Sequence, residues 1–292
     1  MTVASLGLLL ALVTAEAPAP SFPQAYCAAT SGESEPWSVT IHPTEPAHLA
    51  QAEHLLETYP DADGLVRGLH RSNVPLPWRH LEDFTLVSAD GAVHTNAKST
   101  GVVSAPSGAA FVFYLTTRAG PKAPYQVGLA IEGHHELTTR TWKDVARPTP
   151  RITEERFADL RKPFAEYIRT RRPRAGKPWL AARFVRWIEA DLGGGVEALM
   201  ITSGADWSAI AAVDSSGALL DVPAGTETPP GGAPGVMEYA KFEAVAITDL
   251  DADGHDEVVV YEEWYEGLYI WLVRWDPTAK TIVADLVCGD AA

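Results

Sequence analysis

The chain has 292 residues, of which 46% are hydrophobic and 21% charged, so it is long enough to bury one large core or two modest ones. Its formal net charge of −15 at pH 7 argues against a nucleic-acid-binding protein, because phosphate neutralisation needs a dominant basic surface. We therefore expect a folded protein without a nucleic-acid partner.

The N-terminus has the pattern of an export signal. An apolar run covers residues 6–13, and the small residues after it predict cleavage after Ala15, so residues 1–15 are interpreted as a signal peptide. No basic residue precedes the run, and a buried N-terminal strand or helix is the alternative. The run is too short to span a bilayer, and no other segment resembles a membrane span. We expect an extracytoplasmic protein, periplasmic or secreted, whose residues 16–35 form an extended linker.

The only two cysteines, Cys27 and Cys288, lie near the two ends of the mature chain. In an oxidising compartment they are a natural disulfide pair. The alternative is two unpaired thiols, one on each terminus.

Residues 36–175 predict a mixed α/β region. A helical stripe of apolar residues ends at Pro60, and a second helix is expected to be kinked or divided by Pro163. Between the helices, alternating runs predict strands and a hairpin. The helices are expected over residues 46–59 and 154–169, and the strands over residues 84–87, 93–95, 110–116 and 125–131.

Histidines are not expected to form a metal centre. His134 and His135 are adjacent, and adjacent residues of a strand point to opposite faces, so both cannot bind one ion without a bulge. His48 and His54 lie six residues apart on the first predicted helix and are interpreted as solvated. The chain also lacks a nucleophile elbow, a phosphate-binding glycine loop and a dinucleotide fingerprint, so we nominate no catalytic residue.

A basic stretch covers residues 169–177. One interpretation is binding to an anionic partner such as envelope lipid or polysaccharide. The other, which we prefer, is a solvated helix end followed by a linker.

The strongest motif is the acidic loop, residues 249–257, which reads Asp-Leu-Asp-Ala-Asp-Gly-His-Asp-Glu. Aspartates at alternate positions of a tightly curled loop converge on one point, Gly254 permits the sharp turn, and a hard cation relieves the crowding of negative charge. The segments on both sides read as strands, and position twelve is Val260 rather than glutamate. Both features argue against an EF-hand.

This spacing between two strands resembles the FG-GAP or VCBS repeat, which occurs in integrin-type propellers and in many secreted bacterial proteins. The resemblance covers about residues 244–280. It implies a structural Ca²⁺ whose ligands are the side chains of Asp249, Asp251 and Asp253, the backbone carbonyl of His255 and the carboxylate of Glu257. Asp256 is expected to point outward.

A second, degenerate copy is expected near residues 184–215. Residues 184–192 resemble residues 242–250 at an offset of 58, but glycines at positions 193–195 replace the later aspartates. We interpret this as an internal repeat that has lost its ligands. Chance similarity between two strand-turn-strand units is the alternative.

Aromatic residues are concentrated in the C-terminal segment. Tyr269, Trp271 and Trp275 share one face of a predicted strand that is apolar on both faces, which is typical of a buried central strand. A carbohydrate-stacking platform formed with Trp264 and Tyr265 is the alternative to core packing.

These observations predict a mainly β protein with a few helices. Its N-terminal half is mixed α/β, and residues 176–292 form partial or divergent β-propeller-like antiparallel sheets. The expected function is that of an exported, non-enzymatic protein with a structural calcium loop, a binding or envelope-associated protein with an unknown protein or polysaccharide partner. One alternative is an extracytoplasmic hydrolase of glycans or phosphoesters with the repeat as scaffold; another is a carbohydrate-binding module. The oligomeric state is left open.

Overall fold

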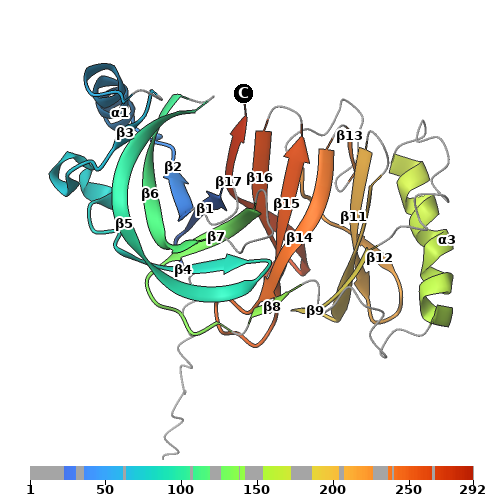
Figure 1. Ribbon diagram of the computed structural model, residues 1–292. Coiled ribbons are helices and arrows are strands. Elements are labelled where there is room, and N and C mark those ends of the chain that lie inside the picture. Colours follow the sequence, from blue (N-terminus) through green and yellow to red (C-terminus); the bar gives the residue numbers. More distant parts are fainter. Residues whose placement is uncertain are drawn as a thin grey trace, which may run out of the picture.

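The computed structural model describes most of the chain as three antiparallel sheets and two α-helices. Every pairing among the described strands is antiparallel, so the prediction of a mainly β protein is confirmed (Figure 1). The signal peptide, residues 172–177 of the basic stretch and Tyr265 lie outside the described residues. Those described are 23–30, 36–61, 64–105, 108–118, 126–137, 139–141, 154–171, 186–203, 207–225, 236–238, 240–264 and 267–291.

The first sheet is a barrel. Its strand order is β3-β5-β4-β7-β1-β2-β6, and an additional pairing of β5 with β6 closes six strands on themselves. The predicted hairpin is β4–β5, in which Ser88 pairs with Gly91 across a two-residue turn. The strands are β1 (Ala25–Thr30), β2 (Pro36–Ile41), β3 (Val66–Arg67), β4 (Asp83–Ser88), β5 (Gly91–Ala105), β6 (Gly108–Arg118) and β7 (Gln126–Glu132).

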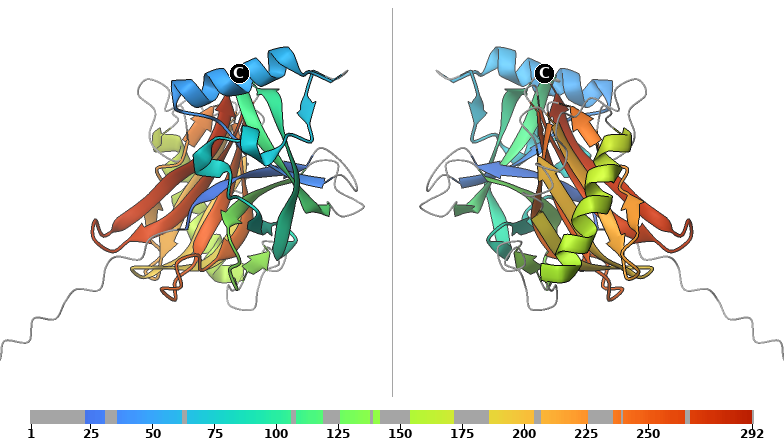
Figure 2. Two further views of the ribbon diagram at one scale, coloured as in Figure 1. Left: turned by 90° about the vertical axis from the view of Figure 1, so that its left-hand side faces the viewer. Right: turned by 90° about the vertical axis from the view of Figure 1, so that its right-hand side faces the viewer.

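The barrel core is filled by side chains from alternate positions of its strands. In β2, Trp37, Val39 and Ile41 are buried while the residues between them are partly exposed, as period-two patterning requires. The predicted first helix is α1 (Pro46–Thr58), which buries Ala52 and Leu55 in the barrel core and lies across one end of the molecule (Figure 2). Two 3₁₀ turns, η1 (Arg71–Asn73) and η2 (Leu76–Trp78), follow it.

The C-terminal half forms two four-stranded meanders. The middle sheet has the order β17-β16-β15-β14-β8, and the outer sheet has the order β12-β11-β10-β9, with β13 pairing β11. The middle strands are β8 (Thr139–Thr141), β14 (Ala240–Thr248), β15 (Glu257–Trp264), β16 (Gly267–Asp276) and β17 (Thr281–Ala291). The outer strands are β9 (Arg186–Gly193), β10 (Val196–Ser203), β11 (Trp207–Asp214), β12 (Leu219–Asp221) and β13 (Val236–Glu238).

The middle sheet is buried on both faces. Val258 and Val260 pack in a core shared with the outer sheet, whereas Val259 and Tyr261 pack in a core shared with Leu129 of the barrel. A sheet covered on both sides needs apolar residues at consecutive positions, which is what β15 supplies. Barrel, middle sheet and outer sheet are therefore stacked in that order (Figure 1).

The second helix, α3 (Glu154–Arg171), forms the last layer. It packs Phe164 and Ile168 against Met200 on the far face of the outer sheet (Figure 1). Of the two effects expected of Pro163, a kink or a division of the helix, the division is wrong, because α3 continues through it. Pro163 and Asp159, whose carbonyl the missing N–H would bond, are both exposed, so water can satisfy that carbonyl.

Two predicted boundaries differ from the structure. Residues 16–35 were expected to be a linker, but residues 25–30 form β1, held between β7 and β2. Tyr26, Ala28 and Thr30 alternate inward, which gives this small-residue strand its buried face. The division at residue 175 also does not follow the layers, because β8 and α3 both precede it and pack with the C-terminal sheets.

The propeller part of the fold prediction is not supported. The described strands form two stacked meanders beside a closed barrel, and they do not form a ring of blades.

A disulfide joins two of the layers. Cys27 of β1 and Cys288 of β17 are bonded, with their Cα atoms 5.6 Å apart and a sequence separation of 261. The predicted pairing is confirmed, and it ties the barrel to the edge strand of the middle sheet. No helix in the described ranges is long and apolar enough to cross a membrane.

Removing this disulfide should destabilise the protein. Cys27→Ser combined with Cys288→Ser is expected to lower the free energy of unfolding by about 2–5 kcal/mol, because the unfolded chain regains the freedom that so long a loop denies it. Urea unfolding measures this. Reduced wild type should match the double variant, and equal midpoints for the variant and the oxidised wild type would contradict the expectation.

Candidate metal centre

The acidic loop joins β14 to β15 at one end of the middle sheet. Ala252 (φ 59°) and Gly254 (φ 90°) adopt left-handed conformations, which curl the chain tightly. The curl turns backbone N–H groups onto the aspartates: Asp253 donates to Asp249 and to Asp251, each at 3.2 Å, and Gly254 donates to Asp249 at 3.1 Å. These local bonds hold both carboxylates in place before any ligand is considered.

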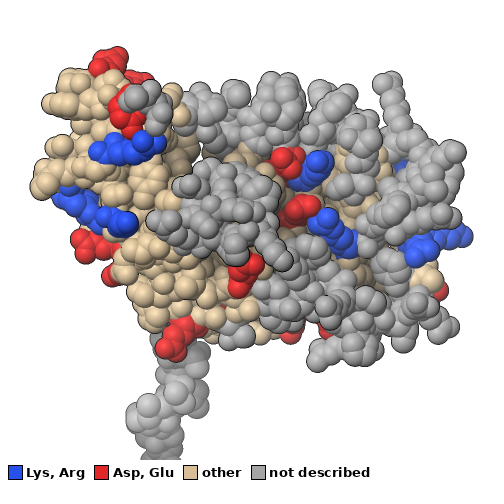
Figure 3. Space-filling model, in the orientation of Figure 1, with Lys and Arg blue, Asp and Glu red and all other residues tan. Residues whose placement is uncertain are grey.

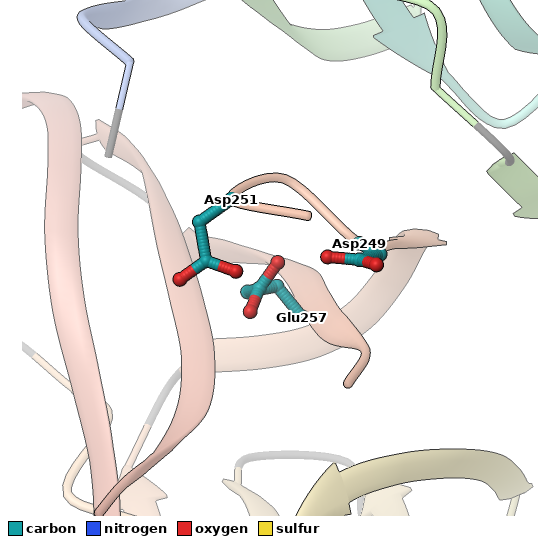
Figure 4. Close-up of side chains that lie close together, drawn as sticks. All are labelled: Asp249, Asp251 and Glu257. Atoms are coloured by element: carbon teal, nitrogen blue, oxygen red, sulfur yellow. The ribbon is translucent and has the colours of Figure 1, made fainter. Parts of the chain in front are cut away.

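Three carboxylates converge here. Asp249, Asp251 and Glu257 each bring one oxygen to within 4.8 Å of the others (Figure 4). Figure 4 shows the two aspartates on the loop and Glu257 at the start of β15, with the three side chains facing one another. Within the described part of the chain, no other group of three His, Cys, Asp or Glu residues meets in this way.

The most confined member is Glu257. Its residue is only 3% exposed, and its Oε2 accepts a hydrogen bond from the Leu250 N–H at 2.6 Å. Leu250 itself is buried in the core between the middle sheet and the barrel. The buried side chain of Leu250 thus anchors the loop, and Glu257 is more buried than the two aspartates.

The predicted ligands divide into two groups. Asp249, Asp251 and Glu257 are brought together, whereas Asp253 is exposed and accepts a hydrogen bond from the His255 N–H at 2.8 Å. The His255 ring lies toward the outer sheet, with Nδ1 3.5 Å from Asp191 Oδ1. The ligand roles of Asp253 and of the His255 carbonyl stay predictions.

The crowding perturbs protonation. Burial, followed by the charges of Asp251, Asp253 and Asp249, raises the pKa of Glu257 to about 8, against the opposing effect of the Leu250 N–H. Burial and then the neighbouring charges of Asp253 and Asp249 also raise the pKa of Asp251. A cation at the convergence point would act in the opposite direction and favour the ionised carboxylates.

The donor set fits a hard divalent cation. All three convergent groups are carboxylates, the oxygen ligands that Ca²⁺ and Mg²⁺ prefer. Zinc and copper sites favour imidazole or thiolate, and neither belongs to this group. The residues present therefore suit the metal that the sequence predicts.

A second loop lies directly beside the acidic loop, within the segment near residues 184–215 that is predicted to be a degenerate copy. It is the glycine loop, residues 191–195, at the end of β9 and the turn into β10. The Asp256 N–H donates to the Asp191 carbonyl at 2.6 Å, and the Asp191 N–H donates to Asp256 Oδ2 at 2.7 Å. The expectation that Asp256 points outward is wrong, because its carboxylate turns to an N–H group 65 residues away in sequence.

His134 and His135 follow the end of β7 at Glu132, so they do not lie on a strand as expected. The His134 ring contacts the His94 ring edge-on at 4.6 Å between centroids, whereas His135 Nε2 lies 2.8 Å from the carbonyl of Glu132. His48 packs edge-on against Trp78 at 5.3 Å. None of these side chains joins the acidic cluster.

The aromatic residues of β16 belong to the core. Trp271 is buried and its Nε1–H donates to Glu262 at 2.7 Å, while Tyr269 and Trp275 pack against the core between the middle and outer sheets. Core packing is thus confirmed for these three residues. The side chain of Trp264 lies outside the described part.

No family model, curated protein or solved structure matches this chain. The resemblance of residues 244–280 to the FG-GAP or VCBS repeat therefore rests on the spacing of the acidic loop and stays a prediction.

The metal-free protein should lose stability as pH rises. The raised pKa means that folded Glu257 binds its proton more tightly than the unfolded chain does, so this contribution is complete below about pH 4.5 and is lost as pH rises through about 8. With chelator present, the urea concentration at the midpoint of unfolding should decrease as the pH is raised from 5 to 9. In Glu257→Gln this decrease should be smaller.

The matched control is Glu263→Gln, an exposed position on the same strand, which should follow wild type. Parallel pH curves for wild type and Glu257→Gln would contradict the assignment.

Proposed function

We propose that this is an exported, calcium-stabilised protein in which the acidic loop holds a structural Ca²⁺, and that it acts as a binding or envelope-associated protein. The observation that supports this best is the convergence of Asp249, Asp251 and Glu257 on a curled loop. Hard oxygen ligands on such a loop are the usual setting for calcium.

A structural rather than catalytic ion suits the surroundings. Glu257 is almost fully buried, Leu250 is fixed in the core on the barrel side, and Asp256 is bonded to the outer sheet. An ion at this point would neutralise carboxylates at a junction of all three layers. It would also counteract the burial and the neighbouring negative charges that raise the pKa of Glu257.

The compartment is inferred from the disulfide. A bond between Cys27 and Cys288 fits an oxidising environment. Extracellular calcium modules commonly bind with dissociation constants of about 10⁻⁴ to 10⁻³ M. We expect this loop to work in that range.

The partner is proposed only as a class, a protein or a polysaccharide. On the face shown in Figure 3, acidic and basic side chains of the described residues are interspersed. Among the described residues, Arg186 pairs with Glu243 and Arg274 pairs with Asp285. A partner for such a surface would be recognised by local contacts rather than by one extended field of charge.

Calcium should stabilise the wild-type protein and not a variant without the convergent aspartates. With a dissociation constant of about 10⁻⁴ M, about 10 mM calcium should raise the free energy of unfolding by about 2.7 kcal/mol. Asp249→Asn combined with Asp251→Asn should abolish both this gain and the binding heat in calorimetry.

The control is Asp61→Asn, because residues 61–64 resemble the start of the acidic loop in sequence, and Asp61, which accepts a hydrogen bond from the Leu65 N–H, lies shortly before β3 of the barrel. This variant should respond to calcium as wild type does. If wild type shows no binding heat at millimolar calcium and its melting temperature is unchanged, the proposal is contradicted.

A further inference from the structure

The acidic loop and the glycine loop are joined by a reciprocal pair of hydrogen bonds. The backbone N–H of Asp256 donates to the backbone carbonyl of Asp191 at 2.6 Å, and the backbone N–H of Asp191 donates to Asp256 Oδ2 at 2.7 Å. Residue 256 is thereby fixed at both its backbone and its side chain. It stands between His255 and Glu257, two of the five predicted calcium ligands.

The first of these bonds sets the direction of a predicted ligand. The peptide between His255 and Asp256 is trans, and in a trans peptide the N–H and the preceding C=O point in opposite directions. Because this N–H points at Asp191, the His255 carbonyl points away from the glycine loop. That carbonyl is the backbone ligand that the resemblance implies.

Glycines allow the two loops to approach this closely. Gly193, Gly194 and Gly195 all have left-handed φ angles of 84°, 59° and 82°. A Cβ at Gly193 would lie 3.1 Å from the His255 ring, and one at Gly194 would lie 2.2 Å from the Trp275 ring. Gly193 and Gly194 thus let this loop approach the middle sheet, and at the offset of 58 Gly193 stands where the acidic loop has Asp251.

We infer that the glycine loop is the positioning element of the calcium site, and that Asp191 and Asp256 are positioning residues that aim the His255 carbonyl and hold the start of β15 at Glu257. This inference rests on the proposed calcium binding. In this account the degenerate copy has exchanged its own ligands for a role in ordering those of its neighbour.

The inference makes calcium affinity depend on a contact between two sheets. Coupling of this kind is reciprocal, so calcium should in turn tighten the contact of the outer sheet with the middle sheet. A loop that bound calcium by its own residues alone would show no such linkage.

Two substitutions at one position separate the hydrogen bond from the charge. Asp256→Asn and Asp256→Ala remove the same negative charge near the ion, but only asparagine keeps a side-chain oxygen for the Asp191 N–H. In calcium calorimetry on the full chain, the asparagine variant should bind within about threefold of wild type. The alanine variant should bind about tenfold more weakly or worse, the usual scale for loss of an outer-shell partner.

A second measurement monitors the contact between the outer and middle sheets. Hydrogen exchange at the Asp191 amide should slow on adding calcium to wild type and to the asparagine variant, and should not slow in the alanine variant. The matched controls are Asp285→Asn and Asp285→Ala, because Asp285 is an exposed residue of β17. Both should leave calcium affinity unchanged. If Asp256→Ala does not fold, Gly193→Ala, which pushes the loop off His255, takes its place.

The outcomes distinguish the two proposals. Wild type that binds calcium while the Asn and Ala variants bind equally well would overturn the positioning role alone. Wild type that binds no calcium would overturn the proposed function, and the inference with it.

Discussion

The double burial of the middle sheet is the constraint on which the rest of the structure depends. Strand β15 places Val258 and Val260 against the outer sheet and Val259 against the barrel, so neither face can be left to water. Each such side chain contributes about 1.5–3 kcal/mol when fully buried. The sheet therefore requires both neighbours, and the loop between β14 and β15 contacts both of them.

Two features reinforce that arrangement at different places in the sheet. At the edge strand, Cys288 is bonded to Cys27 of the barrel. At the β14–β15 end, the acidic loop inserts Leu250 toward the barrel and bonds Asp256 to the outer sheet. Crowded carboxylates at such a junction oppose folding at neutral pH unless a cation neutralises them, which is why we regard the ion as a brace.

How much the sequence predicts depends on how local the signal is. The apolar runs of β6 and β7, the stripe of α1 and the spacing of Asp249, Asp251 and Glu257 are local, and each predicted what the structure contains. The orientation of Asp256 was not predictable in this way, because its partner is a backbone N–H in a loop 65 residues earlier.

The barrel escaped prediction for the same reason. Its closure needs β5 to pair with β6 as well as with β4, and register between strands is set by burial against neighbours rather than by residue type alone. Strand β1 was taken for a linker because its alanines and threonine pack well only once β7 and β2 flank them. The strand-turn-strand units of the C-terminal half did follow from the sequence, whereas their stacking as two sheets beside the barrel did not.

A crystal structure of the full chain grown with millimolar calcium tests the central claim most directly. The account predicts one ion bound by oxygens of Asp249, Asp251, Asp253 and Glu257 and by the His255 carbonyl, at about 2.3–2.6 Å. The Asp256–Asp191 hydrogen bonds should be intact in that crystal. A structure with only water between these carboxylates, or with the His255 carbonyl turned toward the glycine loop, would contradict it.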